Sequence, residues 1–221
     1  MQTAWVLHRR PYRETSALVE LLTAEGRQRC VIRGKGRDAL LTPFVPLMVE
    51  LGPIRDLRNL KQIEAVGPSL SLAGQGLFCG LYLNELCVRL LPEQDANPEL
   101  MAAYSDALIA LSRGDIEAPL RSFELDLLSA LGFSWSVAQL ENGDAVLDHA
   151  HYWVHPESGP RMAPNDAHGS FPGHVLKRVQ NREFEDSETR LAAKRLNRAR
   201  LAALLGSKPL QSRQLLQGLH S

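Results

Sequence analysis

The sequence predicts an α+β protein: a five-stranded β-barrel over residues 1–68, followed by a mainly α-helical domain over residues 69–221. Three observations predict this. Short apolar or alternating runs separated by Gly and Pro fill the first 66 residues. From residue 76 onward, apolar residues recur at helical spacing. The change falls at Gly67-Pro68, a dipeptide typical of a turn.

Five short runs predict the strands of the barrel. They span Ala4–His8, Thr15–Thr23, Arg27–Arg33, Phe44–Leu51 and Leu57–Val66. The run Ala24-Glu25-Gly26 has the composition of a hairpin turn between the second and third strands. Five strands in so short a segment favour a small closed barrel over a sandwich.

The second half of the chain predicts six helices. Their ranges are about 76–91, 97–111, 119–131, 172–180, 187–205 and 211–219. Residues 133–169 show no clear period, and their Gly, Pro, His and aromatic residues favour loops with a short hairpin.

Charge is segregated along a chain whose formal net charge is zero. Residues 1–70 carry a net charge of +4, residues 71–150 carry −9, and residues 151–221 carry +5. Two basic blocks flanking an acidic one suggest separate surfaces for separate partners.

Several function classes are disfavoured by the sequence. No apolar run reaches the ~18 residues of a membrane helix, and the N-terminus lacks the pattern of a signal peptide. Three cysteines without CxxC spacing argue against disulfides and a thiolate zinc site, which favours a reducing cytoplasm. We find no GxSxG, P-loop, HExxH or dinucleotide motif. We therefore expect no catalysis, cofactor, small-molecule substrate or membrane partner.

The histidines offer one alternative. His149, His151 and His155 are spaced so that two of them share a strand face, which is a pattern that can bind zinc. No cysteine or carboxylate nearby completes a tetrahedral set, so we expect surface histidines and no metal. A metal-dependent hydrolase would need this cluster.

Basic residues predict a nucleic-acid interface in two places. A small barrel rich in cations can follow a phosphate backbone, and so can a basic stripe on a helix. The expected DNA-binding residues are Arg9, Arg10, Arg27, Arg29, Arg33, Lys35, Arg37, Arg58 and Lys61 in the barrel, and Arg190, Lys194, Arg195 and Arg198 on the helix at 187–205. Tyr12 is a candidate for stacking on a base. A scaffold whose barrel binds protein instead of DNA is the alternative.

Five motifs, in this order, resemble the bacterial RecO recombination-mediator family along essentially the whole chain. They are Ala4–His8 with Arg13–Ser16, Gly80–Leu86, Leu120–Leu125 with Leu131–Phe133, Ala193–Arg195, and Lys208–Arg213. The resemblance implies an N-terminal OB-fold and a cytoplasmic, nucleoid-associated protein of DNA repair and recombination. It also implies binding of single- and double-stranded DNA, annealing of complementary strands, and loading of RecA, together with RecR, onto DNA coated by single-strand binding protein.

The resemblance further implies that the helical domain binds the acidic, Phe-ending tail of the single-strand binding protein. Such a tail requires a cation beside an apolar pocket. We expect Arg121 with Phe123 and Leu127 to supply both, with Arg89 as a second cation.

The chain departs from the family pattern twice. Some members carry four cysteines in a zinc module after the LG segment, and this chain has none there, so we expect a degenerate, metal-free module. The basic loop after the third strand is also short, at Gly34–Asp38. That shifts the expected DNA contact toward Arg9, Arg10 and the C-terminal helix.

Overall fold

The computed structural model describes residues 1–33, 40–54, 57–138, 140, 142–156, 158–165 and 167–218, with side chains to residue 215. Contacts divide the chain into two compact units: Met1–Ile116 with Pro209–Ser221, and Glu117–Lys208. The first unit groups three helices with the barrel, whereas the sequence-based division after residue 68 separates strands from helices.

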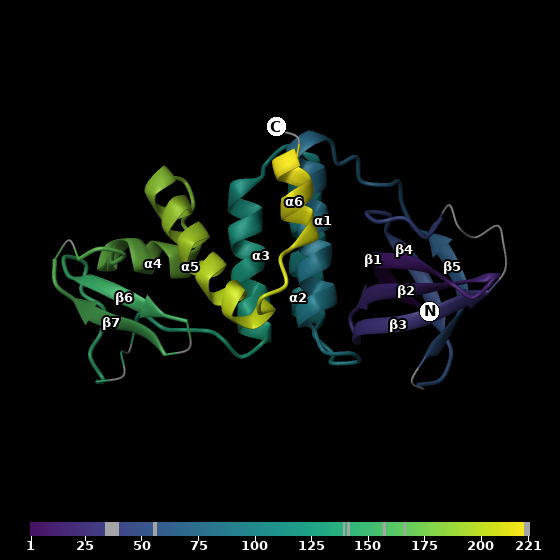
Figure 1. Cartoon of the computed structure of the whole chain (residues 1–221), viewed down its shortest axis with the longest axis horizontal. Coiled ribbons are helices and arrows are strands. Elements are labelled where there is room, and N and C mark those ends of the chain that lie inside the picture. Colours follow the sequence, from purple (N-terminus) through teal and green to yellow (C-terminus); the bar gives the residue numbers. More distant parts are fainter. Residues whose placement is uncertain are drawn as a thin grey trace. The chain divides into compact units, whose positions relative to one another are not determined.

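Five strands of the first unit close into a β-barrel (Figure 1). They are β1 (Gln2–Tyr12), β2 (Ser16–Thr23), β3 (Gly26–Arg33), β4 (Leu47–Leu51) and β5 (Arg58–Ala65). The order around the barrel is β1-β2-β3-β5-β4, in which the β3–β5 pair is parallel and the other pairs are antiparallel. The prediction of a five-stranded barrel of OB type followed by helices is confirmed.

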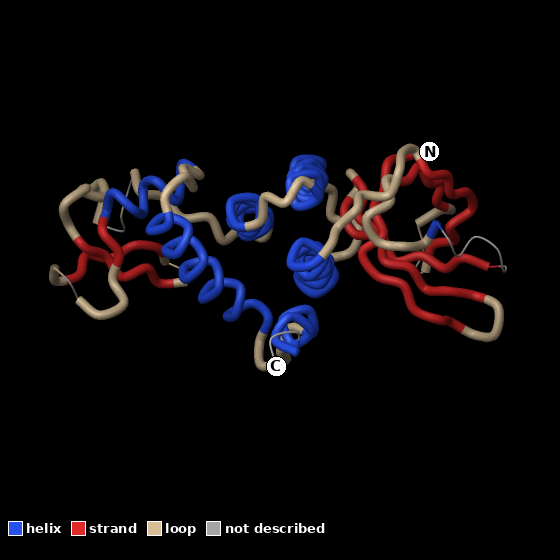
Figure 2. Tube along the Cα trace, turned by 90° about the horizontal axis from the view of Figure 1, so that it is seen from above, coloured by secondary structure: helices blue, strands red, loops and turns tan. Residues whose placement is uncertain are grey.

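Alternate strand residues fill the inside of the barrel. Val6 on β1, Val19 and Leu21 on β2, and Val49 on β4 are fully buried in one apolar cluster. Figure 2 shows the strands curving around this interior. Because side chains alternate between the two faces of a strand, the residues between these positions face outward.

The first strand is longer than the predicted Ala4–His8. A bulge between Val6 and His8 shifts its register, and β1 then continues to pair with β2 as far as Tyr12 opposite Ser16. Bulges bend a strand and increase its twist, which allows one strand to take part in the barrel and extend beyond the bulge. Arg9 and Arg10 therefore lie within a strand and do not end one.

Two helices pack against the barrel in the first unit. They are α1 (Gly74–Leu90) and α2 (Pro98–Ser112). The Asn84 side chain on α1 donates to the carbonyl of Leu7 on β1 at 3.0 Å and accepts from the Tyr104 hydroxyl on α2. All three groups are buried. This asparagine, within the Gly80–Leu86 motif, therefore joins three elements.

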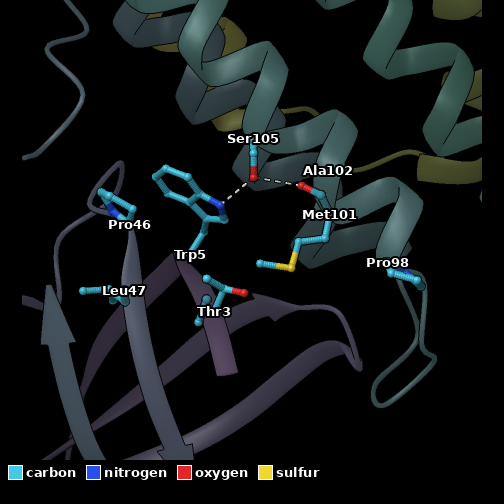
Figure 3. Close-up of a pocket in the computed structure, with 9 residues that line it drawn as sticks. Thr3, Trp5, Pro46, Leu47, Pro98, Met101, Ala102 and Ser105 are labelled. Atoms are coloured by element: carbon cyan, nitrogen blue, oxygen red, sulfur yellow. Dashed lines mark hydrogen bonds between the residues drawn. The ribbon is translucent and has the colours of Figure 1, made fainter. Parts of the chain in front are cut away.

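Trp5 fixes α2 to one end of β1 (Figure 3). Its indole N–H donates to the Ser105 hydroxyl at 2.8 Å, and that hydroxyl donates to the Met101 carbonyl at 3.0 Å. Beside them lies an apolar hollow of about 260 Å³, which Pro46 also lines. Tyr12 lies seven residues further along β1, roughly 23 Å away in an extended strand. The contact between Trp5 and α2 therefore does not extend to the Tyr12 end of β1.

The C-terminal helix α6 (Gln211–Gly218) returns to α1. The Glu85 carboxylate accepts from the backbone N–H groups of Gln211 and Ser212, both at 2.9 Å. Burial raises the pKa of Glu85, but these hydrogen bonds outweigh it and hold the pKa below its usual range. Glu85 thus satisfies the first N–H groups of α6, as a capping residue does. The Lys208–Arg213 motif is explained in part by this contact.

The second unit combines three helices with a small antiparallel sheet of order β7-β6-β8. Its elements are α3 (Glu117–Ala130), β6 (His151–His155), β7 (Gly159–Ala163), β8 (Phe171–Pro172), α4 (Gly173–Asn181) and α5 (Ser187–Leu205). The predicted hairpin is present as β6 and β7. The two-residue strand β8 is not predicted, because two residues show no period.

Helix α5 packs against both α3 and α4. Tyr152 on β6, Val175 and Leu176 on α4, and Leu196 on α5 are buried in the core of this unit. One face of the sheet is therefore closed by helices. In the described parts of the chain, no helix is long and apolar enough to cross a lipid bilayer.

Candidate nucleic-acid interface

An exposed basic row crosses three strands at one end of the barrel. Tyr12 on β1 lies directly opposite Ser16 on β2, and Ser16 lies opposite Arg33 on β3. Directly opposed residues share a face, so Tyr12 and Arg33 lie together, with Arg10 two residues along β1 on the same face. Both arginines are exposed. We call Arg10, Tyr12, Arg13 and Arg33 the open row.

Arg13 completes the open row from the turn between β1 and β2. Its guanidinium carbon lies 5.2 Å from the centre of the Tyr12 ring, and its φ of 54° places it in the left-handed region. In the described part of the chain, no carboxylate forms an ion pair with Arg10, Arg13 or Arg33. The row combines exposed cations with an aromatic ring, which suits phosphates and bases respectively.

The opposite end of β3 is closed by acidic residues. Arg27 donates to the Leu91 carbonyl at 2.9 Å and pairs with Glu20 at 2.6 Å. Arg29 pairs with Glu20 at 3.0 Å and with Glu93 at 2.9 Å, and the hydrogen bond from Glu20 raises the pKa of Arg29. Arg27 is only 8% exposed. These two predicted DNA contacts are occupied within the fold, so we leave them out of the interface.

The predicted contacts on β5 differ from one another. Arg58 is buried, and it donates twice to the Gly52 carbonyl, at 3.0 and 2.9 Å, and once to Gln28 at 2.8 Å. It holds the β4–β5 connection against β3 and is not accessible to a phosphate. Lys61 is exposed and pairs with Glu50 at 3.2 Å, which partly neutralises it.

Three predicted barrel cations remain. Arg9 is exposed, but it lies opposite Val19, whose side chain faces the barrel interior, so it points away from the face of the open row. Lys35 and Arg37 lie outside the described residues, in a segment that follows Arg33 of the open row directly.

The basic stripe on α5 is only partly available. Arg190 donates to the carbonyls of Phe184 and Glu185, so it holds the turn before the helix. Lys194 lies 3.4 Å from Glu117, and Arg195 covers the Phe171 ring at 4.7 Å. Arg198 is exposed, and no partner for it is found in the described residues. The stripe is thus a basic surface on which three of the four predicted cations already contact other groups of the fold.

The residues predicted to bind an acidic tail do not form a surface. Phe123 and Leu127 are buried in α3, and Arg121 is 5% exposed, with its guanidinium 2.8 Å from the buried Glu124 carboxylate. Arg89 belongs to the other unit and donates to the Pro209 carbonyl at 3.2 Å. The Arg121 guanidinium faces inward because its ion-pair partner Glu124 is itself buried, where Asn197 on α5 donates both to the Glu124 carboxylate and to the Arg121 backbone carbonyl. It is a structural residue, not a docking cation.

A different pocket has the predicted properties. A cavity of about 220 Å³ in the second unit is lined by Leu125, Trp135, Arg182 and Arg200, together with polar side chains. Arg200 is 4% exposed and donates to the Pro156 carbonyl at 3.2 Å. Burial lowers its pKa to about 10, and no carboxylate in the described residues pairs with it. A buried guanidinium beside an indole suits a ligand that carries a carboxylate and an apolar group.

Arg182, which lines the same cavity, is paired with an acidic residue of α3. Both of its terminal nitrogens contact the Asp126 carboxylate, and the hydrogen bonds raise its pKa. Sequence reasoning missed this pocket because Arg200 lies on a strongly basic helix, where arginine normally reaches solvent, and Trp135 lies in the irregular segment. Its one sequence signal is a tryptophan directly after the Leu131–Phe133 motif.

The histidine cluster is the alternative candidate for a metal site. His151 and His155 lie on β6, and His151 is 3.2 Å from the Ser170 hydroxyl. In the described ranges, no three His, Cys, Asp or Glu side chains gather as metal ligands do. The metal-free state of the segment stays a prediction.

Comparisons with known proteins cover both halves of the chain. The family model "Recombination protein O N terminal" matches residues 1–69, and "Recombination protein O C terminal" matches residues 73–214. This chain belongs to the recombination protein O family. Its barrel corresponds to the N-terminal model, and the helices that follow correspond to the C-terminal one. Membership places the chain among proteins of DNA repair and recombination, as the sequence motifs predict.

Curated relatives extend over nearly the whole length. The chain is 43% identical over 220 residues to the DNA repair protein RecO of Pseudomonas entomophila, covering 98% of this chain and 96% of the relative. It is 42% identical over 222 residues to the protein of that name in Methylococcus capsulatus, covering 97% and 91%. With the protein of Pseudoalteromonas atlantica, identity is 39% over 225 residues, covering 98% and 93%.

Proposed function

We propose that this chain is a non-enzymatic recombination mediator that binds single- and double-stranded DNA at the open row and anneals complementary strands. The observation that carries this proposal is the row itself: three arginines without carboxylate partners in the described chain, grouped around Tyr12 at one end of an OB-type barrel. Membership in the recombination protein O family supports the same function. It would act in the bacterial cytoplasm, at the nucleoid.

The chemistry of annealing requires no bond to be made or broken. Two strands repel through their phosphates, and arginines that replace condensed counterions lower that repulsion. Phosphate contacts carry no sequence information, so complementary bases are free to find each other by pairing. The half-buried Tyr12 ring adds stacking without base selection. The row therefore provides attraction to the backbone without sequence preference.

The finer partners follow from the resemblance and from the second unit. With RecR, the chain would help to load RecA onto DNA coated by single-strand binding protein. The acidic, Phe-ending tail of that protein would dock in the cavity of Arg200 and Trp135, the terminal carboxylate on the guanidinium and the phenyl ring beside the indole. This assignment replaces the Arg121 surface, which is buried.

The test of DNA binding is a titration of labelled single- and double-stranded DNA at two salt concentrations. We expect salt-sensitive binding to both, and the double variant Arg10→Glu with Arg33→Glu is expected to lose most of it. Arg113→Glu, the same type of substitution at one exposed arginine that caps the end of α2, is the control. Absence of binding at low salt would contradict the proposal and favour the protein-binding scaffold.

Annealing and tail binding are tested separately. Wild-type chain should accelerate pairing of complementary strands coated by single-strand binding protein, and removal of the acidic tail should abolish that acceleration. Trp135→Ala is expected to weaken the binding of an acidic, Phe-ending peptide without changing the affinity for naked DNA. Leu147→Ala, at an exposed apolar side chain of the same unit, is the control. Equal peptide affinity in the two variants would show that the tail does not bind in this cavity.

A further inference from the structure

One face of the small sheet in the second unit points away from the core of that unit. Tyr152 on β6 points into the core, and the alternation of a strand places His151, Trp153 and His155 on the opposite face. Arg161 on β7 lies directly opposite Trp153, so the two side chains share that face. Trp153 and Arg161 are both exposed.

Trp153 is held in place although it is exposed. Trp153 is 45% exposed, yet its indole N–H donates to the His168 carbonyl at 3.2 Å. The hydrogen bond restricts the ring before any ligand arrives, which lowers the entropic cost of a contact. A restrained, exposed indole on a sheet is the geometry on which unpaired bases stack.

The charged side chains within the three strands favour a polyanion. The sequences of β6, β7 and β8 contain two histidines and an arginine, and no acidic residue. Arg161 is the permanent cation directly beside the ring. A ligand in which a flat ring lies next to each negative charge fits this face. Single-stranded nucleic acid has this arrangement, because each nucleotide carries one base and one phosphate.

We propose that the Trp153 face binds single-stranded nucleic acid, with one unpaired base stacked on the indole and Arg161 contacting the adjacent phosphate. Duplex DNA is excluded from the stacking contact because its bases are already stacked on each other. This inference rests on the proposed function, since it assumes that the chain binds DNA. It adds a second site, in a different unit from the open row, so that one chain can hold two strands.

The experiment compares Trp153→Ala, Trp153→Phe and wild type for binding to a thymidine oligonucleotide and to an abasic strand of equal length. One base stack contributes about 1–3 kcal/mol, so Trp153→Ala should weaken oligonucleotide binding about tenfold. Trp153→Phe, which keeps an aromatic face, should restore most of it. The abasic strand should bind both variants and wild type alike. Met162→Ala, an exposed side chain on β7, is the matched control.

Tryptophan fluorescence gives an independent signal. Trp5 is buried and Trp153 is exposed, so a stacked base should quench Trp153 emission in wild type. In Trp153→Phe the quenching should disappear while binding persists. Unchanged oligonucleotide affinity in Trp153→Ala, or an equal loss on the abasic strand, would overturn this inference alone and point to a protein ligand. Absence of all DNA binding in wild type would instead overturn the proposed function.

Discussion

The two ends of strand β3 carry the same residue type with opposite outcomes. Arg27 at the start is buried and bound to Glu20 and the Leu91 carbonyl, whereas Arg33 at the end is exposed in the open row. The difference is what covers each end. The segment after α1 lies so close to the start that a Cβ at Gly26 would be 2.0 Å from the Asp95 carbonyl oxygen. An arginine therefore marks an interface only where the fold leaves it uncovered.

Removing the covered arginine should produce the largest effect. Arg27→Ala leaves the buried Glu20 carboxylate and the Leu91 carbonyl without one of their donors, and breaking a buried ion pair costs about 3–5 kcal/mol. We expect a loss of that size in the free energy of unfolding, measured by urea denaturation. Arg33→Ala, on the same strand, is the control and should stay within about 0.5 kcal/mol of wild type. Equal losses in both variants would remove the contrast between the two ends.

The strand pattern predicts part of this contrast and misses the rest. Alternation correctly places Arg27, Arg29 and Arg33 on one outer face of the third strand. It carries no information on which part of that face another segment covers, because Glu93 and Leu91 are more than sixty residues away in sequence. Short strands and helices are predictable from local period, whereas long-range pairing of a charged group is set by the assembled fold.

The helical domain shows the same limit. Helical spacing predicts α3 and α5 correctly, and the amphipathic pattern places Arg121 near Phe123 and Leu127. The Arg121 guanidinium nevertheless faces the buried Glu124 carboxylate, while Arg200 on α5 lines a cavity. A helix period locates a face to within about one residue, and an arginine stem can reach either side of that boundary.

Cys30 reports on closure in the middle of β3. Burial raises the pKa of its thiol to about 12 from an ordinary 9.0, which lowers the reactive thiolate about thousandfold at pH 8. We expect alkylation of native Cys30, followed by mass spectrometry, to be slower than in the unfolded chain by at least that factor, because burial also keeps the reagent from the thiol. Above about pH 9 the unfolded rate should level off while the native rate continues to rise. Fast native labelling at pH 8 would show that the barrel opens.

The same pKa has a consequence for stability. A thiol whose folded pKa is raised stabilises the fold fully below its unfolded pKa of 9.0. That contribution is lost as pH rises from 9 through about 12, so the free energy of unfolding should decline in that window. Cys30→Ala should flatten part of the decline.

Neutralising one cation of the open row should have a moderate effect on DNA alone. In Arg10→Ala or Arg33→Ala, the slope of log affinity against log salt concentration should become shallower by about 1, which corresponds to the loss of one phosphate contact. DNA binding at low salt should be several-fold weaker. Arg58→Lys, a change at a covered arginine, should leave the slope unchanged. A change of slope in Arg58→Lys equal to that in Arg33→Ala would place the interface at the wrong end of the barrel.

Tyr12 is expected to give the smallest effect and the most specific one. Its ring lies beneath the Arg13 guanidinium, so part of its face is already occupied and only a fraction remains for a base. Tyr12→Leu should therefore weaken the binding of single-stranded DNA about two- to fivefold, which is at the low end of the range for base stacking. The affinity for duplex DNA should stay unchanged. Fluorescence anisotropy with matched single- and double-stranded oligonucleotides measures both. Equal weakening of the two would mean that Tyr12 acts by positioning Arg13 against phosphates, and the open row would then contact only the backbone.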